Sequence, residues 1–131
     1  VTSAGESADK ALAEALFAAL SEGGERLRWE PLFFDWFGGV ASETRALAGP
    51  RAALYEAPAL RAFRDRLAAH APDRPERLAH PYFGAAEPQE LLIDEIESIW
   101  ARIAEADDWS AFEAKVAAIG QAREAYGIAV A

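Results

Sequence analysis

Three acidic side chains near residue 90 have the spacing of a possible cation site. Glu90, Asp94 and Glu97 stand at i, i+4 and i+7, which places three carboxylates on one face of a helix. Hard divalent cations take such oxygen ligands. The same pattern is typical of a solvated face opposite an apolar stripe, and the Glu-x-x-His pairs of di-metal bundles are absent from the sequence. We therefore expect the solvated face, with no metal site and no cofactor in this chain.

The histidines, His70 and His80, are the other candidates for acid–base chemistry or metal ligation. His80 precedes Pro81, which favours an extended backbone at the histidine. A metal site there would need carboxylates such as Glu90 or Asp94 as further ligands, because the sequence has no cysteine. A small helical enzyme or metal protein built on His80 is therefore our third hypothesis, and we predict no catalytic residue.

The glycine pairs do not form a phosphate-binding loop. Gly38-Gly39 is not followed by Lys-Ser or Lys-Thr, so we interpret the pair as a helix stop. Nucleophile elbows and dinucleotide-binding fingerprints are also absent from the sequence. No cofactor-binding residue is predicted.

Aromatic side chains are the strongest feature of the sequence. The segment "FFDWFGG", residues 33–39, places four of them within two helical turns, so they cannot all face one way. Two or three should pack inward, and one or two should remain at the surface. The segment "HPYF", residues 80–83, adds two more aromatic side chains that must be either buried or exposed. Either these rings form a core cluster, or they form a docking patch for another domain or subunit. The candidate interface residues are Phe33, Phe34, Trp36, Phe37, His80, Tyr82 and Phe83.

The composition limits the cellular compartments and the classes of binding partner that fit this chain. The 131 residues carry a formal net charge of −9, which disfavours binding to nucleic acid and to anionic membranes. No apolar run approaches the roughly 18 residues of a membrane-spanning helix. The absence of cysteine fits a reducing compartment, and the start "VTSAGESADK" lacks the pattern of a signal peptide. We expect a cytoplasmic protein that binds neither nucleic acid nor membrane.

Proline and glycine divide the first half of the chain into helical segments. A helix with Ser7 as N-cap should end at Gly23-Gly24, and Leu12, Leu16 and Leu20 give it helical spacing. Shorter segments should follow at 31–37, 42–49 and 50–57, and a longer helix at 58–70. Leu60, Phe63 and Leu67 share one face of that last helix.

Two longer helices are predicted after a proline-rich linker at 71–88. The first should run from Glu87 or Pro88 to about Ala106 and carry the stripe Leu92, Ile96, Ile99 and Ile103, widened by Ile93 and Trp100. Asp107 or Asp108 should cap the last helix, which ends near Tyr126-Gly127. It carries Trp109, Phe112, Val116 and Ile119.

No stretch alternates with the period of a strand. We therefore predict an all-α fold, an irregular bundle of five to eight helices, several of them short, with no sheet. The length corresponds to one domain. We place a disordered tail at 1–6, a single helical domain at 7–127, and a second tail at 128–131.

The string "FFDWFGG…RALAGPRAALY…RPERLAHPYF…EPQELLIDEIESIW…DDWSAFEAKVAAI" resembles the C-terminal region of some bacterial selenoprotein O-like proteins, over residues of about 8 to 126. That family has a protein-kinase-like fold and transfers AMP from ATP to protein hydroxyls, using Mg²⁺. Its nucleotide-binding and metal-binding motifs have no match here. The resemblance implies that an N-terminal core absent from this chain holds the ATP and Mg²⁺, so no catalytic residue is carried over.

Two function hypotheses therefore lead. The first is a non-catalytic C-terminal segment of a protein adenylyltransferase, which packs against the catalytic core of its parent protein through the aromatic residues. The second is a free-standing acidic helical module that binds another protein by the same surface. The sequence leaves both open.

Overall fold

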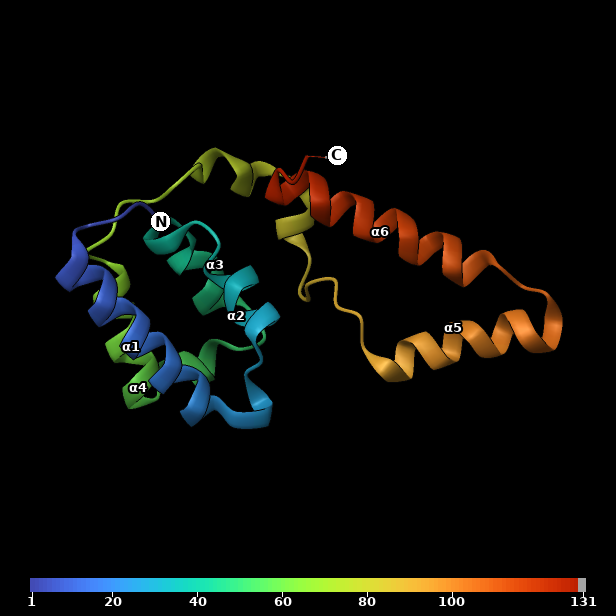
Figure 1. Cartoon of the computed structure of the whole chain (residues 1–131), viewed down its shortest axis with the longest axis horizontal. Helices are drawn as coiled ribbons and strands as arrows, with labels where there is room; N and C mark the ends of the chain where they lie inside the picture. Colours follow the sequence, from blue (N-terminus) through green and yellow to red (C-terminus); the bar gives the residue numbers. More distant parts are fainter. Residues whose placement is uncertain (130–131) are drawn as a thin grey trace. The chain divides into compact units, whose positions relative to one another are not determined.

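The structure is a computed structural model that describes residues 1–129 (Figure 1). Within that part of the chain, all regular structure is helical: six α-helices and several short 3-10 turns, without a strand. The predicted all-α fold, an irregular bundle of five to eight helices, is confirmed. The chain forms two compact units, Val1–Ala79 and the part that begins at His80, and each is described by itself. The single domain at 7–127 and the tails at 1–6 and 128–131 stay predictions, and residues 130 and 131 lie outside the described part.

The first unit is built around two paired helices, α1 and α4, which lie side by side (Figure 1). Its α-helices are α1 (Glu6–Gly23), α2 (Trp29–Asp35), α3 (Glu43–Ala48) and α4 (Pro58–Leu67). Its 3-10 turns are η1 (Gly24–Arg26), η2 (Gly39–Ser42), η3 (Ala52–Glu56) and η4 (Pro75–Ala79).

The pairing of α1 with α4 follows from their apolar faces. Leu60, Phe63 and Leu67 of α4 are buried, as their i, i+3, i+7 spacing predicts. The leucines of α1, four residues apart, pack against the same core and are partly buried. The buried members of that core are Ala19, Leu27, Leu32, Trp36, Ala46, Tyr55, Leu60, Phe63 and Leu67.

The predicted end of α1 is confirmed, but its predicted N-cap is wrong. The helix stops at Gly23, and Gly24 follows with a φ of 54°, in the left-handed region that glycine tolerates. At the other end, α1 already begins at Glu6, so Ser7 lies inside the helix. The preceding Gly5 has a φ of 102°, a conformation that glycine adopts readily and other residues rarely do. A glycine at that point made the earlier start possible.

The second unit consists mainly of an αα-hairpin, α5 (Ile93–Ala106) and α6 (Ser110–Tyr126), preceded by the short turn η5 (Pro81–Gly84) (Figure 1). Gly127, with a φ of 67°, ends α6 where a stop was predicted. The predicted N-cap of α6, Asp107 or Asp108, is wrong, because the N-cap is Trp109 and α6 begins at Ser110. Asp108 lies one residue before the cap and accepts a hydrogen bond from the backbone N–H of Ser110 at 3.0 Å. Asp107 adopts the left-handed conformation at the end of α5.

The start predicted for α5, at Glu87 or Pro88, is wrong by about one and a half turns. Leu92 has extended backbone angles, so the helix begins only at Ile93. The Lys115 Nζ of α6 donates hydrogen bonds to Gln89 Oε1 at 3.1 Å and to the carbonyl oxygen of Glu90 at 2.6 Å. These bonds hold the segment before α5 as an extended strap. None of the helices in residues 1–129 is both long and apolar enough to cross a membrane.

Candidate functional site

The structure separates the four aromatic residues of the segment 33–37. Phe34 and Trp36 are buried, Phe37 is half-buried, and Phe33 is exposed. The Trp36 ring makes edge contacts with Tyr55 and Phe63 at centroid distances of 5.4 and 6.2 Å. The expectation that two or three of the four pack inward is thus confirmed. Phe34 and Trp36 belong to the core of the first unit and leave Phe33 as the surface member.

A buried ion pair, which the sequence analysis missed, lies within the same segment. Asp35 accepts hydrogen bonds from Arg51 Nε at 2.7 Å and from Arg51 Nη2 at 2.9 Å. The hydroxyl of Tyr55 donates to the same carboxylate. Burial, and then the bond to Asp35, raise the pKa of the Tyr55 hydroxyl far above its usual value, so it stays a proton donor. Because these partners use the oxygens of the Asp35 carboxylate, we assign the cluster a structural role and not a catalytic one.

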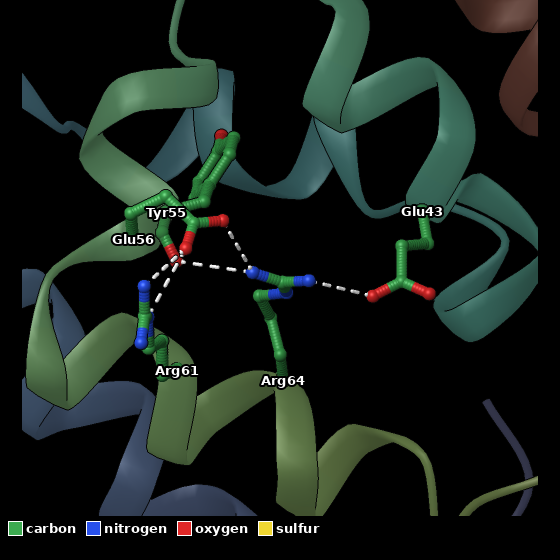
Figure 2. A network of polar contacts seen from close by, with 5 residues as sticks. All are labelled: Glu43, Tyr55, Glu56, Arg61 and Arg64. Atoms are coloured by element: carbon green, nitrogen blue, oxygen red, sulfur yellow. Dashed lines mark hydrogen bonds and ion pairs between the residues drawn. The ribbon is translucent and has the colours of Figure 1, made fainter.

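A polar network lies on the surface between α3, η3 and α4 (Figure 2). Arg64 of α4 reaches Glu43 at 2.8 Å and Glu56 at 3.0 Å, and Arg61 reaches Glu56 at 2.6 Å. Arg61 first, and then Arg64, lower the pKa of the Glu56 carboxyl. The groups line a shallow hollow. Both guanidinium groups already bind carboxylates, so the hollow does not offer them to an anionic ligand. We therefore assign the network a structural role, in which it links α3, η3 and α4.

The histidines lie in separate surroundings. His70 is buried in the first unit, with Nε2 3.0 Å from Asp9 Oδ1 and Nδ1 3.1 Å from the carbonyl oxygen of Arg66. His80 begins the second unit, where its Nδ1 accepts a hydrogen bond from the N–H of Tyr82 and caps η5. Its Nε2 lies 3.9 Å from the Glu124 carboxylate, an acidic neighbour other than the Glu90 or Asp94 that the third hypothesis named.

Acid is expected to loosen the contact between the start of the chain and α1. Asp9 accepts hydrogen bonds from the hydroxyl of Ser3 at 2.5 Å and from the N–H of Ala4 at 3.0 Å, and these bonds, with that to His70, lower the pKa of its carboxyl. A lowered pKa in the folded state means that the stabilisation is present above about pH 4 and is lost as the pH falls through the folded-state value. We expect the Tm of Asp9→Asn to lie below that of the parent chain at neutral pH.

The two Tm values should converge as the pH falls below the lowered folded-state pKa of Asp9, where the parent carboxyl is also neutral. Thermal melts followed by circular dichroism over a series of pH values from neutral to strongly acidic would test this. Glu14→Gln, on the exposed side of α1, is the matched control and should follow the parent chain at each pH. A constant difference between Asp9→Asn and the parent chain across the whole range would contradict the role of the Asp9 charge.

The acidic residues near position 90 do not share a helix face in the structure. Glu90 precedes α5, and only Asp94 and Glu97 lie on that helix. Nowhere in the part of the chain that the structure describes do three histidine, aspartate or glutamate side chains gather as metal ligands would. The late start of α5 therefore removes the geometry on which the cation hypothesis depended.

Tyr82 and Phe83 form a small aromatic cluster with Tyr126 of α6. The ring centroids of Tyr82 and Phe83 lie 5.5 and 5.8 Å from that of Tyr126, and both rings are buried. Ala122 and Ala125 of α6 are buried in the same unit. These two residues of the "HPYF" segment hold η5 against the C-terminal end of α6 and are interior residues of the second unit.

Large apolar side chains are exposed along α5 and α6, on the two helices whose spacing predicted apolar stripes. We define the apolar hairpin face as Ile93, Ile96, Trp100, Ile103, Trp109, Phe112, Val116 and Ile119. All of these except the half-buried Ile103 are between 40% and 68% exposed. No residue of α5 is buried. One feature of the sequence could have indicated this exposure: the two amphipathic helices follow one another, and within residues 1–129 no third helix comes after them to cover their apolar stripes.

The residues of the apolar hairpin face do not line the groove between α5 and α6. That groove is lined by Glu95, Ser98, Ile99 and Arg102 of α5 and by Ala111, Ala114, Lys115 and Ala118 of α6. Lys115 Nζ also donates to Glu95 Oε2 at 2.6 Å. The facing flanks of the hairpin thus consist of mainly polar residues with Ile99 on α5, and of alanines with Lys115 on α6.

A smaller exposed aromatic patch lies on the first unit. Trp29 and Phe33 of α2 stack at a centroid distance of 5.5 Å, and Phe17 of α1 meets Trp29 edge-on at 5.9 Å. All three are about half exposed or more. Phe33 is the predicted interface residue that the structure places at the surface here, and its neighbours Phe17 and Trp29 were not predicted as such.

Comparisons with protein-family models, curated protein sequences and solved structures found no match to this chain. The two exposed apolar surfaces are therefore the features of the described residues that indicate a function.

Proposed function

We propose that this chain is a non-catalytic helical docking module, which binds another protein surface through the apolar hairpin face. The observation that supports the proposal most is the exposure of seven large apolar side chains on two adjacent helices. Contiguous patches of this size on a folded chain mark interaction sites. The polar clusters of the first unit are closed by their own partners and offer no competing reaction centre.

A narrower form of the proposal follows the resemblance to selenoprotein O-like proteins. In that form, the chain is the C-terminal segment of a protein adenylyltransferase, and its partner is the catalytic core that carries ATP and Mg²⁺. The exposed rings of Phe17, Trp29 and Phe33 would then supply the contact that the sequence assigned to "FFDWF", because Phe34 and Trp36 are occupied in the core.

The docking role can be tested with a fluorescent dye that binds apolar surface. At sub-micromolar concentration, the chain should enhance dye fluorescence strongly while it keeps its full helical circular dichroism. The double variant Ile96→Gln, Val116→Gln should lose most of that enhancement, and Gln121→Ser, an exposed position away from the face, should retain it. Weak dye binding by a fully helical parent chain would contradict the proposal.

The narrower form has a separate test, the DNA sequence upstream of the codon for Val1. A reading frame that continues upstream into kinase-like nucleotide-binding features supports it. An in-frame stop codon directly before Val1 contradicts it and leaves the general docking role in place.

A further inference from the structure

We infer that the partner of the apolar hairpin face is a second copy of this chain, so that two α5–α6 hairpins stack face to face as a four-helix dimer. The inference rests on the docking role proposed above and names its partner. Three properties of the hairpin support it: the direction, the spacing and the area of its exposed side chains.

The first property is that both stripes lie on the same side of the hairpin. At about 100° per residue, the mean direction of the α5 stripe is rotated by roughly 130° from the flank that lines the groove toward α6. The α6 stripe has the same spacing and is rotated by the same roughly 130° from its own groove flank, in the same sense. Since the two helices run antiparallel (Figure 1), rotations in the same sense turn both stripes to one side. The hairpin is therefore one layer with a single apolar face.

The second property is the spacing within each stripe. Ile93, Ile96, Trp100 and Ile103 follow intervals of 3, 4 and 3 residues, and so do Trp109, Phe112, Val116 and Ile119. These are the a and d positions by which helices of bundles and coiled coils pack on one another. Both stripes cover about 15 Å of helix. A second hairpin, turned about a two-fold axis, thus presents two stripes of the same spacing and length.

The third property is the area. A large aromatic side chain presents up to about 150–250 Å², and the exposed fractions of the seven side chains amount to on the order of 800 Å². That is the contribution of each partner to an interface of standard size, and it exceeds the roughly 300–600 Å² of the largest patch on a typical monomer. A second copy of the same face therefore matches this patch in area.

The charges of the hairpin are compatible with self-association. Asp94 and Glu105 lie on the side of α5 away from its stripe, and Glu97 and Glu113 lie at the outer edges of the face, by the same rotation of about 100° per residue. Like charges of two copies would therefore meet at the rim, where water and salt screen them. For this reason the dimer should become tighter as the ionic strength rises, the opposite of an interface held by ion pairs.

Sedimentation velocity of the full chain over a range of concentrations tests the inference. We expect a species of twice the 14.2 kDa chain mass that dissociates on dilution. Val116→Asp and Ile96→Asp should each weaken the dimer by at least about a hundredfold, because a carboxylate would be buried in the apolar contact. Gln121→Asp introduces the same charge at an exposed position of α6 away from the face and should leave the dissociation constant within about threefold of the parent value.

Loss of folding in a variant is checked separately. All of these positions are exposed in the single chain, so circular dichroism should show unchanged helix content, and the milder Ile96→Gln, Val116→Gln variant should reproduce the weakening. A parent chain that stays monomeric at every concentration and salt level overturns the inference. A monomer that still binds the apolar dye would leave the docking role with a different protein partner, and a monomer without dye binding would overturn both.

Discussion

Replacing Asp35 by alanine is expected to destabilise the first unit by about 3–5 kcal/mol, because it leaves the Arg51 guanidinium buried without its carboxylate. Both side chains are nearly inaccessible to water, and two hydrogen bonds of 2.7 and 2.9 Å join them. The same change removes the acceptor of the Tyr55 hydroxyl. Urea unfolding followed by circular dichroism would measure the loss.

Two control variants separate the components of that loss. Tyr55→Phe removes only the hydroxyl and should cost about 1–2 kcal/mol. Arg61→Ala breaks an ion pair with Glu56 in which both side chains are half exposed, and it should cost at most about 1 kcal/mol. If Asp35→Ala proved no more destabilising than Arg61→Ala, the buried pair would not have the role described.

Replacing Trp36 by alanine is the second large effect, with an expected loss of about 3–5 kcal/mol. The indole fills the core of the first unit between Tyr55 and Phe63, so its removal leaves a cavity that the surrounding helices can close only in part. The matched variant Phe33→Ala, three residues earlier on the exposed side of α2, should cost about 1 kcal/mol or less. Urea unfolding of both variants gives the comparison.

The comparison distinguishes the two roles of the aromatic residues in the "FFDWFGG" segment, as core residues or as surface residues. A large loss for Trp36→Ala with a small one for Phe33→Ala assigns Trp36 to the core and leaves Phe33 available for a partner. Equal losses in the two variants would contradict the division between interior and surface that the structure shows.

The helices of the first unit were largely predictable because their signals are local. Pro58 marks the first residue of α4 and Gly23-Gly24 the end of α1, and apolar spacing identified the faces that meet. Ser7 was misjudged because a glycine with positive φ, two residues earlier, let the helix begin sooner. The buried pair of Asp35 and Arg51 could not be inferred, since its members lie 16 residues apart and only the fold brings them together.

The second unit shows the limit of spacing as evidence. The intervals of the stripe Leu92, Ile96, Ile99 and Ile103 predicted an amphipathic helix, which α5 is, but spacing does not tell whether anything covers its face. The late start of α5 depends on Lys115, which lies more than 20 residues further along the chain. The candidate surface was thus predictable as a stripe, and its exposure was visible only in three dimensions.

The absence of buried residues in α5 also has a calorimetric consequence. The heat-capacity change of unfolding comes mainly from apolar surface that becomes exposed. Since the apolar side chains of α5 are already partly exposed, melting α5 uncovers less new apolar surface than melting a core helix, and the curvature of the stability with temperature should arise mostly from the core around Tyr55 and Phe63. Association through the apolar hairpin face would bury this apolar surface. It should therefore have a negative heat-capacity change, even at a temperature where its enthalpy is close to zero.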